Sequence, residues 1–212
     1  MSKLIATSHN IGLILALVLA ATAMPTIASE QPLPRLVLQI TIDQLRGDLP
    51  RRYYERLGEG GFRSLLDEGL VYINAHHAHA NTETVVGHAT LATGADPARH
   101  GMIGNVWFDR QQGAVVYGVE DPRYPLLGDG RVDKATEIDP TQKAARSDGR
   151  SPAAILVSTF GDELNLSLGG RSKIFGVSVK DRGAITLAGH TGKAFWFSKK
   201  SGQFVTSQFY YD

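Results

Sequence analysis

The expected fold and site depend on one stretch, TETVVGHATLATGADPARHGMIGN, which runs from Thr82 to Asn105. Its polar start leads into a short apolar segment, residues 85–92, that suits a helix. A glycine turn follows, then a His-Gly pair and a Gly-Asn corner at Gly104-Asn105. A hydroxyl at a helix start, followed by loops with anion contacts, is typical of a nucleophile that works on an anionic group.

The composition is that of an ordinary globular protein. The 212 residues are 42% hydrophobic and 20% charged, which is enough for one substantial α/β domain with a core. Residues 1–28 have the pattern of a secretory signal peptide: Lys3 precedes the apolar run 11–21, and small residues follow at Ala23 and Ala28. The run is short for a membrane span, so an uncleaved anchor is the weaker interpretation. We therefore expect a periplasmic or secreted protein.

The net charge and the absence of cysteine limit the possible binding partners and the sources of stability. Without residues 1–28, basic and acidic residues are equal in number, which gives no electrostatic basis for binding nucleic acid or an anionic membrane. No stable membrane insertion is expected after signal cleavage. There is no cysteine, so stability has to come from core packing, a metal, or both.

The first half of the mature chain predicts two strands and two helical pieces. Arg35–Ile42 (RLVLQITI) is a continuous apolar run typical of a strand buried on both faces. Asp43 would then lie at the carboxyl end of a central strand, where open α/β sheets bind ligands, although it could equally cap a turn. Helical pieces are expected after Asp48 and before Gly69, followed by a strand passing into a loop over residues 70–80.

The second half continues the alternation. It predicts two short strands within 106–117, a surface insertion or cap over 120–150, a helix that starts at Ser151-Pro152 and ends at Gly169-Gly170, a strand over 173–179, a short helix or turn over 183–188, and a β-hairpin over 194–207. This order favours a layered α/β fold. Residues 29–212 would form one catalytic-domain portion.

The histidines do not indicate a metal site by themselves. His76, His77 and His79 lie close together, but adjacent residues of a strand point to opposite faces, so only His77 and His79 could share a metal. No nearby carboxylate completes such a site. His88 and His100 are better interpreted as packing and loop hydrogen-bonding residues.

Three stretches follow predicted strands: Asp43, the segment 84–105, and Lys180-Asp181-Arg182. Each is weak alone, since Asn105 is a common turn residue and charged residues after a strand are usually solvated. Together an acid, a hydroxyl, an amide and two cations at one sheet edge fit phosphate-ester chemistry.

These residues resemble a family. Asp43 after an apolar strand, T-x-T-x-x-x-H at 82–88, T-G-x-x-P-x-x-H-G at 93–101 and Gly-Asn at 104–105 look like the alkaline phosphatase superfamily, in its type I phosphodiesterase and nucleotide pyrophosphatase branch. The element GVSVKDRGAI at 176–185 resembles the exported, threonine-nucleophile, phosphate-irrepressible alkaline phosphatases, which are monoesterases. The resemblance implies a layered fold with a mostly parallel central sheet flanked by helices.

The resemblance also implies a role for each matched residue. Asp43 would ligate one zinc of a two-zinc site, and Thr84, on the same zinc, would be the nucleophile that forms a phosphothreonine intermediate. Asn105 would donate to a phosphoryl oxygen, and Lys180 and Arg182 would hold the other non-bridging oxygens of a phosphate monoester. Thr82 is the rival hydroxyl, and the family spacing favours Thr84.

The family's other zinc ligands have no counterpart in the sequence. They are an Asp-x-x-x-His element, an adjacent Asp-His pair and a further His, so the resemblance implies the amino-terminal portion of a longer enzyme. Alone, the chain is expected to bind zinc weakly and to hydrolyse little. Two alternatives remain: a phosphodiesterase or nucleotide pyrophosphatase of the same superfamily, and a non-catalytic exported phosphate-binding domain. A sulfatase is unsupported, because there is neither a Cys nor a Ser-x-Pro-x-Arg motif.

Overall fold

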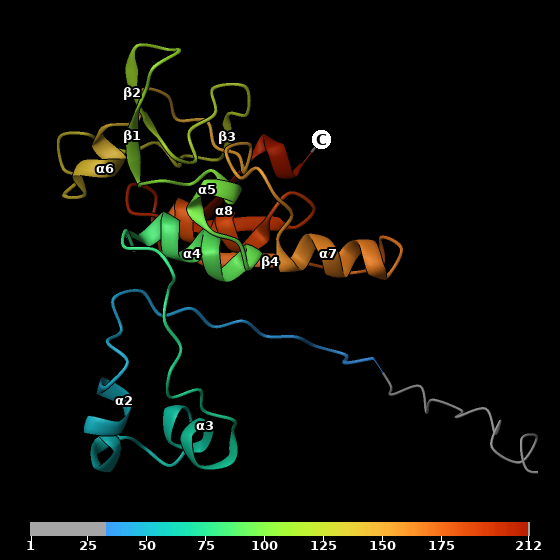
Figure 1. Ribbon diagram of the computed structural model, residues 1–212. Coiled ribbons are helices and arrows are strands. Elements are labelled where there is room, and N and C mark those ends of the chain that lie inside the picture. Colours follow the sequence, from blue (N-terminus) through green and yellow to red (C-terminus); the bar gives the residue numbers. More distant parts are fainter. Residues whose placement is uncertain (1–32, 212) are drawn as a thin grey trace, which may run out of the picture. The chain divides into compact units, whose positions relative to one another are not determined.

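The computed structural model describes residues 33–211, and the chain divides into two units, 1–40 and 41–212. Residues 33–40 of the first unit contain no helix or strand. The second unit contains the elements labelled in Figure 1. Its helices are α2 (Leu49–Arg52), α3 (Phe62–Glu68), α4 (Thr84–Thr93), α5 (Pro97–His100), α6 (Pro140–Lys143), α7 (Phe160–Ser167) and α8 (Asp181–Ala188), with 3-10 turns η1 (Tyr54–Arg56) and η2 (Gln208–Tyr210). Its strands are β1 (Val106–Asp109), β2 (Ala114–Tyr117), β3 (Leu126–Leu127), β4 (Phe175–Ser178), β5 (Lys193–Ser198) and β6 (Gln203–Ser207).

Four of the strands form a mixed sheet in the order β3-β6-β5-β4. β4 and β5 are parallel and are joined through α8, whereas β5 pairs with β6, and β6 with β3, in antiparallel fashion. β1 and β2 form a separate antiparallel hairpin. The predicted α/β class is confirmed. Within residues 33–211 the sheet is mixed and not mostly parallel as the resemblance implied, because parallel pairing is confined to the strand-helix-strand unit of β4, α8 and β5.

Helix α8 packs closely on the sheet because β4 has a glycine at the contact. A Cβ at Gly176 would lie 2.2 Å from the carbonyl oxygen of Ala184, closer than two atoms can approach. On α8 itself, Ala184, Ile185 and Ala188 are fully buried. The small side chains therefore set the distance between helix and sheet.

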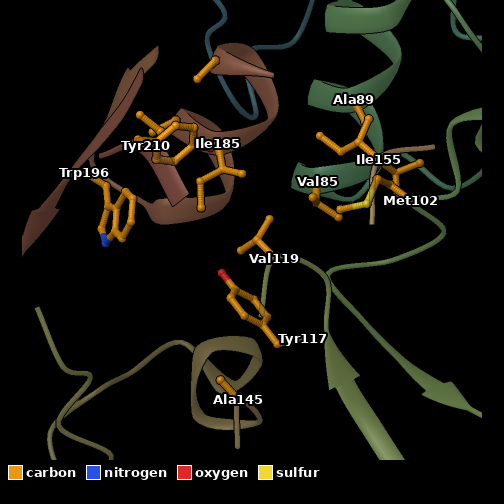
Figure 2. Close-up of a cluster of buried hydrophobic side chains, with 14 of the residues drawn as sticks. Val85, Ala89, Met102, Tyr117, Val119, Ala145, Ile155, Ile185, Trp196 and Tyr210 are labelled. Carbon is orange, nitrogen blue, oxygen red and sulfur yellow. The ribbon is translucent and has the colours of Figure 1, made fainter. Parts of the chain in front are cut away.

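The core lies where α4 and α8 meet (Figure 2). Val85, Val86 and Ala89 of α4 are fully buried in the same cluster as Ile185 and Trp196. Each buried Val or Ile side chain stabilises the fold by about 1.5–3 kcal/mol relative to an exposed one. This packing fixes the first turns of both helices, which carry the candidate site.

Several sequence predictions are confirmed. The expected strands within 106–117 are β1 and β2, with Gly113 at φ +62° in their turn. The strand over 173–179 is β4, the short helix is α8, and the hairpin over 194–207 is β5 and β6. The two helical pieces before Gly69 are α2 and α3.

The predicted strand over Arg35–Ile42 is wrong for this structure. Residues 35–42 form no strand, and Leu36, Leu38 and Ile40 are exposed. An apolar run becomes a buried strand only where hydrogen-bonded neighbours flank it. No strand of the described residues pairs with it.

Two further expectations are wrong. Residues 70–80 contain no strand and have exposed apolar side chains. The helix expected from Ser151-Pro152 starts only at Phe160, because Thr159 and Asp162 form a capping box there. The reciprocal cap satisfies two backbone donors, which makes it a stronger start than the proline upstream.

The segment 120–150, expected to be a surface insertion or cap, also contributes to the interior. It contains β3 and α6, and residues Glu120 and Arg150 at its ends form an isolated antiparallel bridge. Its buried polar side chains include Glu137, Asp139 and Gln142.

The expected signal peptide, residues 1–28, lies outside the described residues. Among helices of the described part, none has the length and apolar character needed to cross a membrane.

Candidate functional site

The hydroxyl and the acid singled out in the sequence are in contact. Thr84 is the first residue of α4, and its Oγ1 donates a hydrogen bond to Asp43 Oδ2 at 3.1 Å. Thr84 is half-buried and Asp43 is exposed. The contact orients a hydroxyl at a helix start, where backbone N–H groups and the helix dipole favour a negative charge.

Asn105 is fixed at the same helix start. Its side-chain Oδ1 accepts from the backbone N–H of Val85 at 3.0 Å, and its backbone N–H donates to Glu83 Oε2 at 2.6 Å. Because Oδ1 accepts from the first turn of α4, the Nδ2 group points away from that helix. Nδ2 makes no hydrogen bond within the described residues. Asn105 thus presents a fixed donor beside Thr84.

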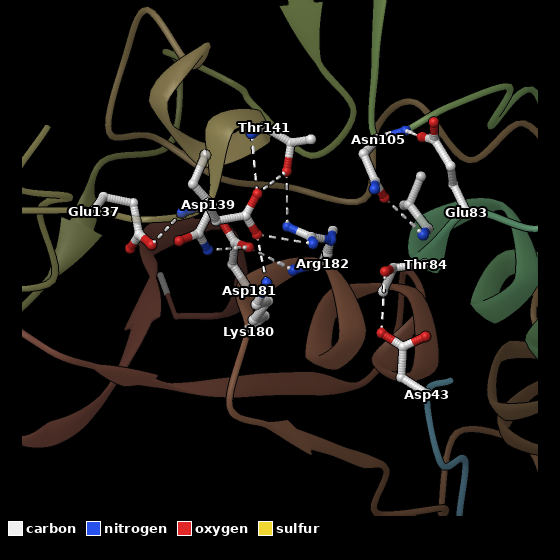
Figure 3. A network of polar contacts seen from close by, with 12 residues as sticks. Asp43, Glu83, Thr84, Asn105, Glu137, Asp139, Thr141, Lys180, Asp181 and Arg182 are labelled. Atoms are coloured by element: carbon white, nitrogen blue, oxygen red, sulfur yellow. Dashed lines mark hydrogen bonds and ion pairs between the residues drawn. The ribbon is translucent and has the colours of Figure 1, made fainter. Parts of the chain in front are cut away.

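Lys180 and Arg182 stand together at the start of α8, with Asp139 between them (Figure 3). Asp139 Oδ2 lies 2.5 Å from Lys180 Nζ and 3.0 Å from Arg182 Nη2. The Arg182 side chain is only 4% exposed, whereas that of Lys180 is 38% exposed. Burial alone would raise the pKa of Asp139, but hydrogen bonds from Lys180 and Thr141 and the charge of Arg182 hold that pKa well below its usual range.

A second buried carboxylate, Asp181, lies under the cations. It accepts from Arg150 Nε at 2.6 Å, from the Tyr117 hydroxyl at 2.6 Å and from Gln142 Nε2 at 3.2 Å. Burial would raise the pKa of Asp181, but the charge of Arg150 and hydrogen bonds from Tyr117, Arg150 and the backbone of Arg182 lower it. Burial, together with the Asp181 charge, raises the pKa of Tyr117 well above its usual value, so the phenol stays protonated and donates.

The packing of α4 against α8 brings the two groups of residues to one region. A Cβ at Gly183 would lie 3.8 Å from His88 Nε2, and His88 is one turn after Thr84 on α4. Its Nδ1 is 2.7 Å from the carbonyl oxygen of Thr84. The structure therefore places Lys180 and Arg182 on the helix that packs beside the one starting at Thr84.

The remaining histidines make local contacts. His100 is fully buried and hydrogen-bonded to Thr90 and to the backbone of Met102, as expected for a loop and packing residue. His79 contacts Asn81 and Thr90, and its ring centroid is 5.0 Å from that of His77. Among residues 33–211 there is no group of three or more His, Cys, Asp or Glu side chains arranged to hold a metal ion.

The residues that sequence reasoning missed are Asp139, Thr141, Glu83 and Tyr117. Asp139 precedes Pro140, the pattern of a helix cap and first-turn proline, and this signal could have marked it as ordered. Its contact with Lys180 spans 41 positions of the sequence, which no local pattern reveals.

Known proteins with similar sequences show which family the chain belongs to. Residues 37–170 match the family model described as type I phosphodiesterase / nucleotide pyrophosphatase. The chain belongs to this family. It is 40% identical to the alkaline phosphatase PhoV of Synechococcus elongatus over 84% of this chain and 30% of that protein. It is also 38% identical to the alkaline phosphatase PafA of Elizabethkingia meningoseptica over 84% of this chain and 31% of that protein.

Two solved structures of the alkaline phosphatase PafA agree with the fold. The crystal structure of wild-type PafA superposes with a TM-score of 0.69 at 36% identity, over 80% of this chain and 30% of that chain. A PafA variant in which a threonine, an asparagine, a lysine and an arginine are replaced gives 0.70 at 34% identity, over 81% of this chain and 31% of that chain. The chain thus spans about 30% of the length of the relatives it matches. The predicted superfamily resemblance and its layered α/β fold are confirmed, and the fold is incomplete in this chain.

Proposed function

We propose that this chain carries the nucleophile and the phosphate-binding residues of an alkaline phosphatase, a phosphoric monoester hydrolase. The observation that carries the proposal is the hydrogen bond from Thr84 Oγ1 to Asp43 at the start of α4, beside the fixed amide of Asn105. The substrates would be small-molecule phosphate monoesters. Because the family relatives are much longer, this is a proposal for the complete protein that contains the chain.

In the proposed reaction, Thr84 Oγ1 attacks the phosphorus atom of the ester. The new O–P bond makes a phosphothreonine, the bond from phosphorus to the ester oxygen breaks, and the alcohol leaves with a proton. Water then attacks the phosphothreonine, which releases inorganic phosphate and restores the hydroxyl. Asp43 orients the Thr84 oxygen, and the start of α4 favours the charge that develops there.

The other three residues would hold the non-bridging oxygens. Asn105 offers the Nδ2 donor, and Lys180 offers a half-exposed ammonium. The guanidinium of Arg182 adds a second positive charge next to Lys180, held in place by Asp139. Two cations and an amide suit a dianion better than a diester, which has one fewer charged oxygen. This charge argument favours the monoester over the phosphodiesterase alternative.

The spacing of the substituted residues in PafA supports the assignment. In that variant the threonine and asparagine are 21 positions apart, and the lysine and arginine are two positions apart. Thr84 and Asn105 have the first separation, and Lys180 and Arg182 have the second.

Zinc is the metal that the family resemblance implies, with two ions in a complete site. Catalytic zinc sites use three protein ligands or more, and the described residues offer only Asp43 and the Thr84 oxygen at the proposed position. These residues do not make a zinc site by themselves. We propose that Asp43 and Thr84 contribute to one whose other ligands lie outside residues 33–211.

A Thr84→Ala substitution tests the proposal in the complete protein that contains this chain. We expect kcat for p-nitrophenyl phosphate to fall at least about 1,000-fold and the phosphothreonine to disappear from peptide mass spectrometry. Thr82→Ala, which removes the rival hydroxyl, is the matched control and should leave both readouts nearly unchanged. Wild-type turnover by Thr84→Ala would refute Thr84 as the nucleophile.

Two comparisons separate the alternatives. A preference for bis-p-nitrophenyl phosphate over the monoester would replace our choice with a phosphodiesterase. Binding of inorganic phosphate that is unaffected by a chelator and by Thr84→Ala, without turnover, would favour a non-catalytic binding domain. We also propose that the protein is exported, on the pattern of residues 1–28, and cleavage after Ala23 or Ala28 would be visible in the mass of the secreted form.

A further inference from the structure

One carboxylate that the proposed mechanism does not use contacts both phosphate-binding cations. Asp139 Oδ2 accepts from Lys180 Nζ at 2.5 Å and from Arg182 Nη2 at 3.0 Å. We propose that Asp139 is a positioning residue, which holds Lys180 and Arg182 in the arrangement that binds the transferred phosphoryl group. This inference rests on the proposed function, because it takes the two cations as the phosphate contacts.

The carboxylate is anchored by the helix that it caps. Asp139 is the N-cap of α6, and its Oδ1 accepts from Thr141 N at 3.0 Å and from Thr141 Oγ1 at 2.6 Å. Because Oδ1 is held by Thr141, the carboxylate cannot rotate freely. Oδ2 therefore stays at the position where it accepts from Lys180 and Arg182. A carboxylate that competed with phosphate for the cations would have to move away when phosphate binds. The hydrogen bonds from Thr141 hold Asp139 in place, so we infer that it positions the cations and does not compete for them.

Arg182 is held from several sides. Besides Asp139, its Nη1 donates to the Tyr117 hydroxyl and to Thr141 Oγ1, both at 3.2 Å. The guanidinium is thus fixed in the interior, where it supplies a preorganised positive charge beside Lys180. Lys180 has Asp139 as its ion-pair partner among the described residues, so the orientation of its flexible chain depends on that contact.

Charge balance supports the same role. Lys180 and Arg182 repel each other, and one carboxylate between them leaves a net charge of about one positive unit for the incoming dianion. The lowered pKa of Asp139 keeps this carboxylate ionised at all working pH values.

Asp139→Asn tests the inference with little change to the fold. Asparagine is as good an N-cap as aspartate, and its carbonyl oxygen can still accept from Thr141. Its NH₂ group then faces Lys180 and Arg182, donor against donor. In the complete protein, we expect kcat/KM for p-nitrophenyl phosphate to fall about 10- to 100-fold. Because the pair with Arg182 is buried, its loss also lowers the urea midpoint, so activity is compared under conditions in which circular dichroism shows both proteins folded.

The matched control is Asp133→Asn. Asp133 is in the same segment and accepts from Ala135 N and Thr136 Oγ1, both at 3.0 Å, without contacting either cation. We expect kcat/KM to change less than about twofold. A similar loss in both variants would show that the segment, and not the Asp139 contact, is responsible.

A double-mutant cycle separates positioning from general damage. In a Lys180→Ala, Arg182→Ala background, Asp139→Asn should change kcat/KM less than about twofold, because there is nothing left to position. An equal loss in both backgrounds, or an increase of kcat/KM in the wild-type background, would overturn the proposal.

Calorimetric binding of inorganic phosphate repeats the cycle without turnover. If the protein lacks phosphatase activity but Asp139→Asn weakens phosphate binding only when the cations are present, the positioning role stands and the proposed function fails. If the protein turns over substrate through Thr84 but neither cycle shows coupling, the proposed function stands and the positioning role fails. If the wild-type protein binds no phosphate, the Asp139 proposal is overturned.

Discussion

Replacing Arg150 by methionine should destabilise the protein far more than removing a surface arginine. Arg150 and Asp181 are each only 2% exposed, and Arg150 Nε is 2.6 Å from Asp181 Oδ2. Arg150 Nη1 also donates to the carbonyl oxygens of Ser147 and Gly149, both at 2.9 Å. Methionine fills similar space without these donors, so Asp181 keeps its charge in the interior without its main partner.

The expected loss is about 3–5 kcal/mol of unfolding free energy, the cost of breaking a buried ion pair from one side. Arg123→Met is the matched control. Arg123 forms a comparable pair with Asp121 at 2.7 Å, but its side chain is 68% exposed, so we expect about 1 kcal/mol or less. Urea titrations followed by circular dichroism give both values.

Asp181→Asn, added to Arg150→Met, sharpens the test. A neutral amide at this position removes the unpaired charge, so the double variant should recover part of the lost free energy. Equal losses for Arg150→Met and Arg123→Met would refute the buried pair as a major source of stability. A double variant less stable than Arg150→Met would show that the loss comes from Tyr117 and Gln142 contacts instead.

Two other predictions concern stability. Gly176→Ala should cost about 1–3 kcal/mol, because its Cβ would meet the Ala184 carbonyl oxygen; Gly58→Ala, with nothing within 4 Å, is the control, and the same urea titration measures both. The hydrogen bond to Asp162 at 2.9 Å raises the pKa of His190, and burial opposes this. The stability that the His190–Asp162 pair contributes is therefore complete below the unfolded pKa of 6.5 and is lost as pH rises through the higher folded pKa. Burial would raise the pKa of Asp162, but hydrogen bonds from His190, Thr159 and Thr191 lower it. The stability that ionised Asp162 contributes is therefore constant above about pH 4. His190→Gln should therefore lower Tm more at about pH 5.5 than at about pH 8.5, and an equal reduction at both would contradict the assignment.

The sequence was sufficient for elements whose signals are local. The β1–β2 turn ends in a glycine with positive φ, the α4 segment is a short apolar run, and the β5–β6 hairpin has its turn at Gly202, with φ +69°. That Asp43 and Thr84 lie close together could also be anticipated, since the resemblance assigns both to one zinc. Each of these features depends on residues close together in the chain or on one shared pattern.

The rest depended on long-range packing. The apolar run 35–42 predicts a buried strand, but the described residues contain no strand that pairs with it. Asp139 and Arg150 were assigned to a surface segment because that segment is rich in Gly, Pro and charge. They are buried because their partners, Lys180 and Asp181, lie at the start of α8, far away in the sequence. Polarity of composition does not distinguish a solvated loop from one that supplies buried ion pairs.

The start of α8 explains why so many acidic residues gather there. Lys180 is the N-cap and Arg182 the second residue of that helix, so both cations lie at the positive end of the helix dipole. A cation in this place is disfavoured by about 0.3–1 kcal/mol, and two cations also repel each other. Asp139 and Asp181 offset that cost, and each is fixed by a cap or by buried donors from Thr141, Tyr117 and Arg150. Cations at this position do not stabilise the helix itself. Their presence therefore favours a role in binding a further anion, the phosphoryl group of the proposed substrate.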